Sequence, residues 1–181
     1  MTTKRIVTDA MLAAMYVVLS SFLSLSLGPM KLSLDGLPIL LAALLFGPVD
    51  GLLVGFVGGM LAQLLGPYGL SVTSVLWVLP DAVRGLIAGL YARLAKQPLK
   101  TVPLGVMLVL NALVVTTLTT GAMYVDCLVF HYAFATYTPY ILWRYLAGII
   151  MAVIFTVILP PIVRLVRRAI PATTGKAGKN G

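Results

Sequence analysis

The feature that most limits the possible folds is a succession of long apolar runs. They cover residues 6–27, 37–46, 51–65, 72–94, 102–124 and 139–166. Four of the six reach the length of roughly 20 residues that a helix needs to cross a bilayer. Hydrophobic residues make up 60% of the chain and charged residues 10%, whereas soluble domains have about 45–50% and about 25%. The sequence therefore predicts an all-α membrane protein, a bundle of six transmembrane helices.

Glycine and proline separate the first runs. Gly28-Pro29 ends the first, Gly47-Pro48 separates the second from the third, and Gly66-Pro67 follows the third. Such pairs interrupt helical hydrogen bonding. The second and third runs are short, so they either extend at their ends or meet as a hairpin that stops short of a full crossing. We expect one membrane domain over residues 1–170, a short polar loop at residues 31–35, and a disordered cytoplasmic tail over residues 171–181.

The basic residues test this topology. Six crossings place both termini on one side, and ten of the 13 Lys and Arg residues then fall on that side: Lys4, Arg5, Arg93, Lys96, Lys100, Arg164, Arg167, Arg168, Lys176 and Lys179. Cytoplasmic loops of membrane proteins collect Lys and Arg. We therefore expect a multi-pass protein of the cell membrane with cytoplasmic termini. A cleaved secretory signal is the alternative for the first run, but Asp9 interrupts it. The net charge of +8 then needs no nucleic acid partner.

Three basic residues are left over: Lys31, Arg84 and Arg144. Lys31 lies in the first outward loop beside Asp35, and Arg144 lies near the outer end of the last helix, where a long side chain can reach the interface. Arg84 falls roughly 18 Å into an apolar core about 30 Å thick. A charge at that depth normally faces a partner or a cavity.

Two interpretations of Arg84 stay open. Asp81 precedes it by three residues, on the same helix face, so the two charges could simply neutralise each other. Alternatively, with Pro80 loosening the backbone, Arg84 points into a polar pocket and binds an anionic group of a ligand, because its planar fork suits a carboxylate.

Aromatic residues gather on the outer side: Tyr68, Trp77, Tyr124, Phe130, Tyr132, Phe134, Tyr137, Tyr140 and Trp143. An interfacial belt of aromatic rings is common in membrane proteins. The density of rings at residues 131–137 exceeds what a belt needs, and flat side chains with polar tips are suited to cover a flat heterocycle. Both interpretations stay open.

Small residues repeat every fourth position, at Gly51, Gly55 and Gly59, and at Gly85 and Gly89. This spacing lets helices approach closely in lipid. Ala10 and Ala14 have the same spacing in the first run, so they form a smooth patch for another helix of this chain or of a partner.

Motifs of several enzyme classes are absent from the sequence. It contains no Gly-x-x-x-x-Gly-Lys-Ser/Thr phosphate loop, a single histidine, His131, and five scattered aspartates without a glutamate. ATP hydrolysis by a phosphate loop, a zinc-protease helix and paired-carboxylate catalysis are therefore not indicated. We predict binding or transport without catalysis, with no metal and no cofactor in this chain.

Residues 37–48, Leu-Pro-Ile-Leu-Leu-Ala-Ala-Leu-Leu-Phe-Gly-Pro, and the Ala10-x-x-x-Ala14 spacing carry a family resemblance. The chain resembles the substrate-binding S component of energy-coupling factor (ECF) vitamin transporters over Lys4 to about Arg168, with a layout most like the folate group. The resemblance implies capture of a vitamin at the outer face, under the loop at about residues 28–36.

The resemblance further implies partners: a transmembrane coupling subunit, contacted by Ala10 and Ala14, and two ATPase subunits that use ATP. The candidate substrate-binding residues are Lys31, Asp35, Trp77, Asp81, Arg84, Tyr124, Tyr137 and Arg144. Folate offers a pterin to stack and carboxylates to pair. Pantothenate or another vitamin or precursor is the alternative, and a stand-alone secondary transporter with Asp81 as its proton site is a further one.

Overall fold

The computed structural model describes residues 3–22, 24–27, 30–66, 69–95, 101–131, 133–134 and 138–169. Within these ranges the chain forms six α-helices and one antiparallel hairpin: α1 (Thr3–Phe22), β1 (Ser24–Leu27), β2 (Met30–Ser33), α2 (Gly36–Phe46), α3 (Pro48–Leu65), α4 (Ser74–Leu94), α5 (Thr101–Phe130) and α6 (Thr138–Ala169). Five of these helices are long and apolar enough to cross a membrane, and α2 is shorter. The predicted six-helix bundle is confirmed, and the predicted tail lies outside the described residues.

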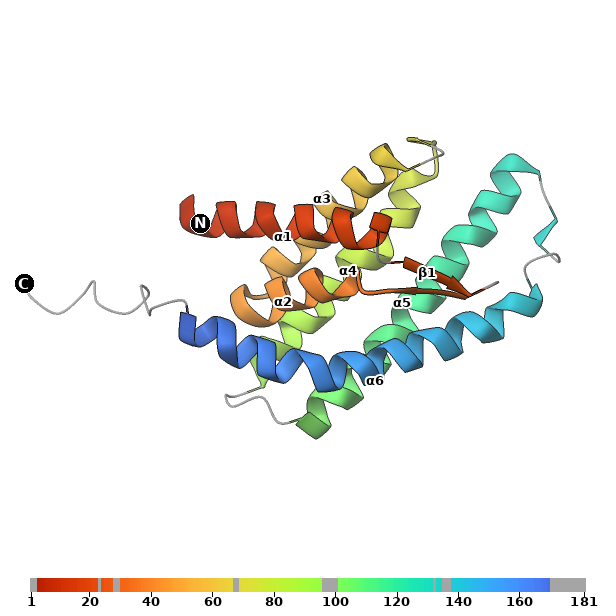
Figure 1. Ribbon diagram of the computed structural model, residues 1–181. Helices are drawn as coiled ribbons and strands as arrows, with labels where there is room; N and C mark the ends of the chain where they lie inside the picture. The colour runs from red at the N-terminus through yellow and green to blue at the C-terminus, as the bar shows by residue number, and fades with distance from the viewer. Residues whose placement is uncertain are drawn as a thin grey trace, which may run out of the picture.

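The start of α1 and the end of α6 lie at the same end of the bundle, and the hairpin lies toward the other end (Figure 1). The first of these, which we call the basic end, carries Arg5, Arg93, Arg164 and Arg167. The positive-inside rule assigns it to the cytoplasm. The opposite end is the outer end.

Helix α2 forms the centre of the bundle. Eight of its eleven residues are buried, and it contacts α1, α3, α4 and α6. Leu40 and Leu44 pack in one apolar cluster with Leu104 of α5 and Leu159 of α6. A helix that is apolar on every side is stable only when it is surrounded. At about 1.5 Å per residue, α2 is about 16 Å long and too short to cross alone.

The first outward connection contains a β-hairpin where we expected a short polar loop. Strands β1 and β2 pair antiparallel, with Ser24 opposite Ser33 and Leu27 opposite Met30. Both strands alternate polar and apolar residues, which is the two-residue period of a strand. The hairpin also contacts α6 through β2, so it reaches across the outer end of the bundle.

Helix α5 ends six residues later than the sequence pattern predicted. We expected its end at Tyr124, but the helix continues to Phe130. Asp126 accepts a hydrogen bond from Thr73 Oγ1 at 2.5 Å, so this carboxylate is accommodated within the helix. His131 has a φ of 55°, a left-handed conformation that commonly ends helices.

The two helices α3 and α4 touch through their backbones. A Cβ added at Gly85 would lie 2.1 Å from the carbonyl oxygen of Gly51, and one at Gly55 would lie 2.4 Å from the carbonyl oxygen of Asp81. The predicted close approach of these glycines is confirmed. Because lipid tails compete with apolar side chains, such close backbone contact is a principal source of helix association in a bilayer.

Alanine substitution at this contact tests it. We expect Gly55→Ala or Gly85→Ala to lower the stability of the folded chain by about 1–3 kcal/mol, because the added methyl group overpacks the interface. The thermal unfolding midpoint of the detergent-solubilised protein is the measurement. Gly121→Ala is the matched control, since a Cβ there meets nothing within 4 Å. Equal losses in all three variants would contradict the interpretation.

Candidate functional site

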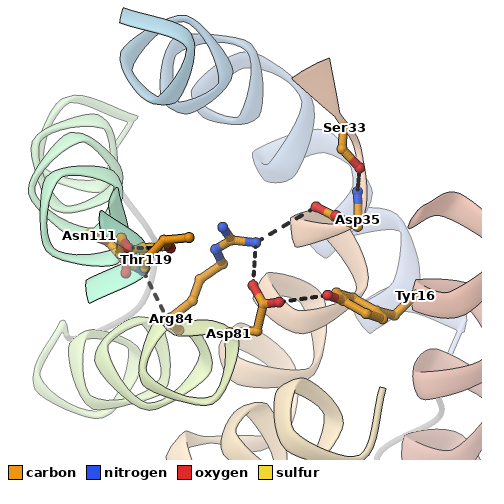
Figure 2. A network of polar contacts seen from close by, with 8 residues as sticks. Tyr16, Ser33, Asp35, Asp81, Arg84, Asn111 and Thr119 are labelled. Atoms are coloured by element: carbon orange, nitrogen blue, oxygen red, sulfur yellow. Dashed lines mark hydrogen bonds and ion pairs between the residues drawn. The ribbon is translucent and has the colours of Figure 1, made fainter. Parts of the chain in front are cut away.

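A partly buried polar network joins α1, α4 and the start of α2. Arg84 Nη1 of α4 lies 3.0 Å from Asp81 Oδ1, one helical turn away on the same face. The other oxygen of that carboxylate accepts a hydrogen bond of 2.6 Å from the hydroxyl of Tyr16 on α1. Figure 2 shows the Arg84 side chain extending from α4 to Asp81, with the Tyr16 hydroxyl on the other side of that carboxylate. The intrahelical pair, one of the two interpretations that the sequence leaves open, therefore exists, and Tyr16 adds a hydrogen bond to it.

Asp35 contributes a second carboxylate from the start of α2. Its Oδ1 lies 3.8 Å from Arg84 Nη1, a distance too long for a hydrogen bond. Asp35 is the N-cap residue of α2, but its side chain makes no capping hydrogen bond, and its backbone N–H donates to Ser33 Oγ at 3.3 Å. Arg84 thus faces two carboxylates, one held closely and one held loosely (Figure 2).

Gly36 makes room for the guanidinium. A Cβ at this position would lie 2.9 Å from Arg84 Nη1 and 3.2 Å from Cε2 of Phe155. The guanidinium therefore lies against the first turn of α2 and beside α6. The hairpin leads directly into this turn, so the network lies where the first outward connection enters the bundle.

Helix α5 closes another side of the network. Asn111 Nδ2 donates to the backbone carbonyl oxygen of Arg84 at 3.1 Å, while Asn111 Oδ1 is buried and has no hydrogen-bond donor in the described part of the chain. Trp77 is half-buried on α4. It precedes Arg84 by seven residues, two helical turns, so it lies on the same face about 10 Å nearer the outer end.

Arg144 lies apart from this network, on the outer half of α6. Its Nη1 donates to Met123 Sδ of α5 at 3.3 Å. Among the residues whose side chains the structure describes, no carboxylate lies within ion-pair distance of Arg144. The two arginines that the sequence singled out therefore differ, because Arg84 is paired and Arg144 carries a half-buried charge beside a thioether.

Of the remaining predicted site residues, Tyr124 has a described side chain, and it takes no part in the network. The Tyr124 side chain is 50% exposed, and its ring packs edge-to-face against Phe134 at 5.3 Å. Phe130, Tyr140 and Trp143 are exposed to a similar degree, as in an interfacial belt. Lys31 lies on β2 opposite Ser26, and its side chain is not described. Tyr137 lies outside the described residues.

A second polar cluster lies at the basic end. The guanidinium of Arg5 on α1 donates to both carboxylate oxygens of Asp50 on α3, with Nε 2.7 Å from Oδ1. It also donates to the carbonyl oxygen of Phe46. Asp50 is only 1% exposed. Asp9 lies next to Asp50, and both of its carboxylate oxygens are buried without a donor in the described part of the chain.

Helix α1 is the least covered of the five long helices. Only 17% of its 18-residue apolar window is buried, against 28–39% in the other four. Its buried side consists of Asp9, Ala13 and Tyr16, whereas Ala10 and Ala14 are exposed on another side. The predicted small-residue patch is therefore available to a second helix.

Two further features lie away from the network. A groove of about 510 Å³ runs between α5 and α6 in the half nearer the basic end, lined by Thr101, Val102, Gly105, Val106, Val109, Leu110, Val153, Thr156 and Val157. None of the predicted site residues lines it. Among the described residues, no cluster of three or more His, Cys, Asp or Glu side chains could hold a metal ion.

Sequence reasoning missed Tyr16, Asn111 and the Arg5–Asp50 pair. The signal for the first two is their position, because a hydroxyl or an amide in the middle of an apolar helix needs a hydrogen-bond partner in lipid. In the sequence, Arg5 carries only an orientation signal, and nothing local marks Asp50 as its partner. Their contact joins residues 45 positions apart, which no local pattern predicts.

Comparison with known proteins gives a family match and a fold match. The profile of the family described as "ECF-type riboflavin transporter, S component" matches residues 1–168. A UPF0397 protein of Lactobacillus johnsonii is 41% identical over 93 residues, which are 50% of this chain and 49% of the relative. The matched part thus spans about half the length of this curated relative.

Two solved structures share the fold. One is described as the crystal structure of FolT bound with folic acid, with a TM-score of 0.66, 22% identity, and coverage of 91% of this chain and 95% of that one. The other is described as the structure and mechanism of the S component of a bacterial ECF transporter, with a TM-score of 0.64, 22% identity, and coverage of 93% and 98%.

The cluster at the basic end predicts different effects on stability for substitutions of Asp50 and Asp9. We expect Asp50→Asn to lower the stability of the folded chain by about 1.5–3 kcal/mol, since it removes the carboxylate that Arg5 binds. Asp9→Asn should leave stability unchanged or raise it, because it removes a charge that has no donor. Thermal unfolding of the detergent-solubilised protein distinguishes them, and equal destabilisation by both variants would contradict this account.

Proposed function

The chain belongs to the family of ECF-type riboflavin transporter S components, and from that premise we propose that it captures a heterocyclic vitamin, folate in the first place, at the network beneath its hairpin. Membership in this family supports a multi-pass membrane protein that binds a vitamin, and we further propose that uptake occurs together with an ECF module. It is a transporter subunit and not an enzyme, as the sequence indicated.

The observation that carries the proposed site is the Arg84 network itself. A guanidinium and two carboxylates lie together in an apolar bundle, although charged groups within a membrane are costly and usually mark a functional site. A purely structural pair would need only Arg84 and Asp81. The loosely held Asp35, next to the hairpin, is what favours a ligand at this position.

Two vitamins have specific support. Folate is favoured because its pterin offers a flat ring for Trp77 and its carboxylates offer a partner for Arg144, which has the Met123 sulfur as its neighbour. The same fold accommodates folic acid in the solved FolT complex. Riboflavin is the second candidate, because the family description names it. Pantothenate, the alternative weighed from the sequence, would use the arginines but leave Trp77 without a ring to stack.

A stand-alone secondary transporter is less well supported. That alternative requires a carboxylate free to take up and release a proton in mid-membrane. Asp81, the residue proposed for that role, is instead bound by Arg84 at 3.0 Å and by Tyr16 at 2.6 Å. Both contacts stabilise its ionised form, so a proton would have to displace them.

The energy for uptake then comes from partner subunits. We expect a transmembrane coupling subunit and two ATPase subunits that use ATP, with the coupling subunit contacting the exposed Ala10 and Ala14 side of α1. The sparse coverage of α1 leaves this side open, and small residues at four-residue spacing favour close helix contact in lipid.

Purification from the native membrane tests the proposal. We expect the tagged full-length chain to bring down two ATPase subunits and a second membrane subunit. Native mass spectrometry should show one bound small molecule with the mass of folate or riboflavin. A chain that purifies alone and takes up a vitamin by itself in liposomes would instead support the secondary transporter.

The α1 patch gives a prediction that separates binding from transport. Ala10→Trp and Ala14→Trp should abolish vitamin uptake by the assembled transporter, while the affinity of the chain for the vitamin stays unchanged. Uptake in vesicles and binding in detergent are measured for the same variants.

Gly121→Trp on α5 is the matched control, because this exposed position meets nothing within 4 Å and uptake should persist. Loss of binding as well as uptake in the two alanine variants would show that the patch packs inside the chain. Loss of uptake in the control would show that any bulky residue on the lipid face is harmful.

A further inference from the structure

The charges of the Arg84 network do not balance. One guanidinium faces two carboxylates, Asp81 at 3.0 Å and Asp35 at 3.8 Å, while Tyr16 adds only a neutral hydroxyl. With all three charged groups ionised, the network carries one surplus negative charge. An anionic ligand group entering it would meet two carboxylates and a guanidinium that is already bound.

Asp35 is the group with unused hydrogen-bonding capacity. Its ion-pair distance exceeds hydrogen-bond length, it makes no capping bond to α2, and no donor reaches its carboxylate elsewhere in the described ranges. The carboxylate is nevertheless only 21% exposed. Asn111 adds a buried amide oxygen without a donor on the opposite side of Arg84. The network thus carries two acceptors that no donor in the described part of the chain reaches within hydrogen-bond distance, the Asp35 carboxylate and Asn111 Oδ1, and a partly buried acceptor without a partner is costly.

From this imbalance we infer the chemistry of the ligand: the network recognises a neutral or cationic nitrogen heterocycle through its N–H donors, which bind Asp35, and any carboxylate of the ligand lies elsewhere. This inference rests on the proposed function and refines it. The edge of an aminopyrimidine or a cyclic imide supplies such donors, and Arg84, held by Asp81, offers its remaining N–H groups to a ring acceptor. This inference differs from the interpretation, left open by the sequence, in which Arg84 binds a carboxylate of the ligand.

Arg144 fits the other end of such a ligand. Phe155, whose ring lies beside Gly36 and Arg84, is eleven residues beyond Arg144 on α6. At about 1.5 Å per residue, the levels of Phe155 and Arg144 are about 16 Å apart along the axis of α6. A ligand with its heterocycle at Asp35 and a negative group toward the outer end would extend in this direction, with Trp77 on the α4 face between the two levels.

The experiment uses the full chain in lipid nanodiscs and five probes. They are folic acid, its heterocycle pterin, its anionic remainder p-aminobenzoylglutamate, riboflavin and pantothenate. We expect folic acid or riboflavin to bind, pterin to compete with folic acid, and the two anions without a heterocycle not to compete. Competition by p-aminobenzoylglutamate or pantothenate at the concentrations at which the heterocyclic probes act would overturn the inference.

Variants assign the contact to Asp35. Asp35→Asn should lower the affinity for the heterocyclic vitamin roughly tenfold to hundredfold, which is the usual contribution of a hydrogen bond to a charged group. If folic acid binds, the same variant should lower the affinity for pterin by the same factor. Arg144→Ala should instead lower the affinity for folic acid and leave that for pterin unchanged. Asp9→Asn, the same exchange at the far end of the bundle, is the matched control and should leave every affinity unchanged.

Unchanged affinity in Asp35→Asn would overturn the inference. A different result would contradict the proposed function. If the wild-type chain binds none of the five probes and purifies without ATPase subunits, it does not capture a vitamin, and the inference about the ligand is then also wrong. Co-purified ATPase subunits together with tight binding of an anion that lacks a heterocycle would leave the transporter role intact and refute only the ligand chemistry.

Discussion

The structure depends on the requirement that the Arg84 guanidinium, placed inside an apolar bundle, has charged partners there. Asp81 satisfies it, and Asp81 in turn is bound by Tyr16. Because these residues come from α4 and α1, the requirement also fixes how the two helices face each other. Asp35 adds the first turn of α2. One guanidinium therefore orients three helices around the point where the hairpin enters the bundle.

Close backbone packing supplies the rigidity around this point. Gly51 and Gly55 of α3 touch the backbone of α4 beside Asp81 and Gly85, so the part of α4 that presents Asp81 and Arg84 lies directly on another helix. Hydrogen bonds to charged groups need partners held in place, and side chains on a well-packed helix meet that condition better than side chains on a loop. The glycine contact and the ion-pair network are thus two parts of one arrangement.

Local sequence patterns predicted the helices and the basic end, and they offered the Asp81–Arg84 pair as one of two interpretations, because hydropathy runs, charge bias and three-residue spacing act over short distances. The pairing of Tyr16 with Asp81 and of Asp35 with Arg84 depends on how distant helices pack, which those patterns do not contain. The hairpin was predictable in principle from the alternation in Ser24–Leu27 and Met30–Ser33 around Gly28-Pro29. The greater length of the neighbouring apolar run obscured it.

The sparse coverage of α1 has a mechanical consequence. Lipid tails solvate apolar side chains about as well as protein does, so the bonds that matter most for α1 are its polar ones, Arg5 to Asp50 near one end and Tyr16 to Asp81 near the other. These two contacts fix both the rotation of α1 about its own axis and its position along the bundle. Without the Tyr16 hydrogen bond, α1 would be held to the other helices by Arg5 and by the apolar packing of Ala13 and Tyr16 against α2 and α3.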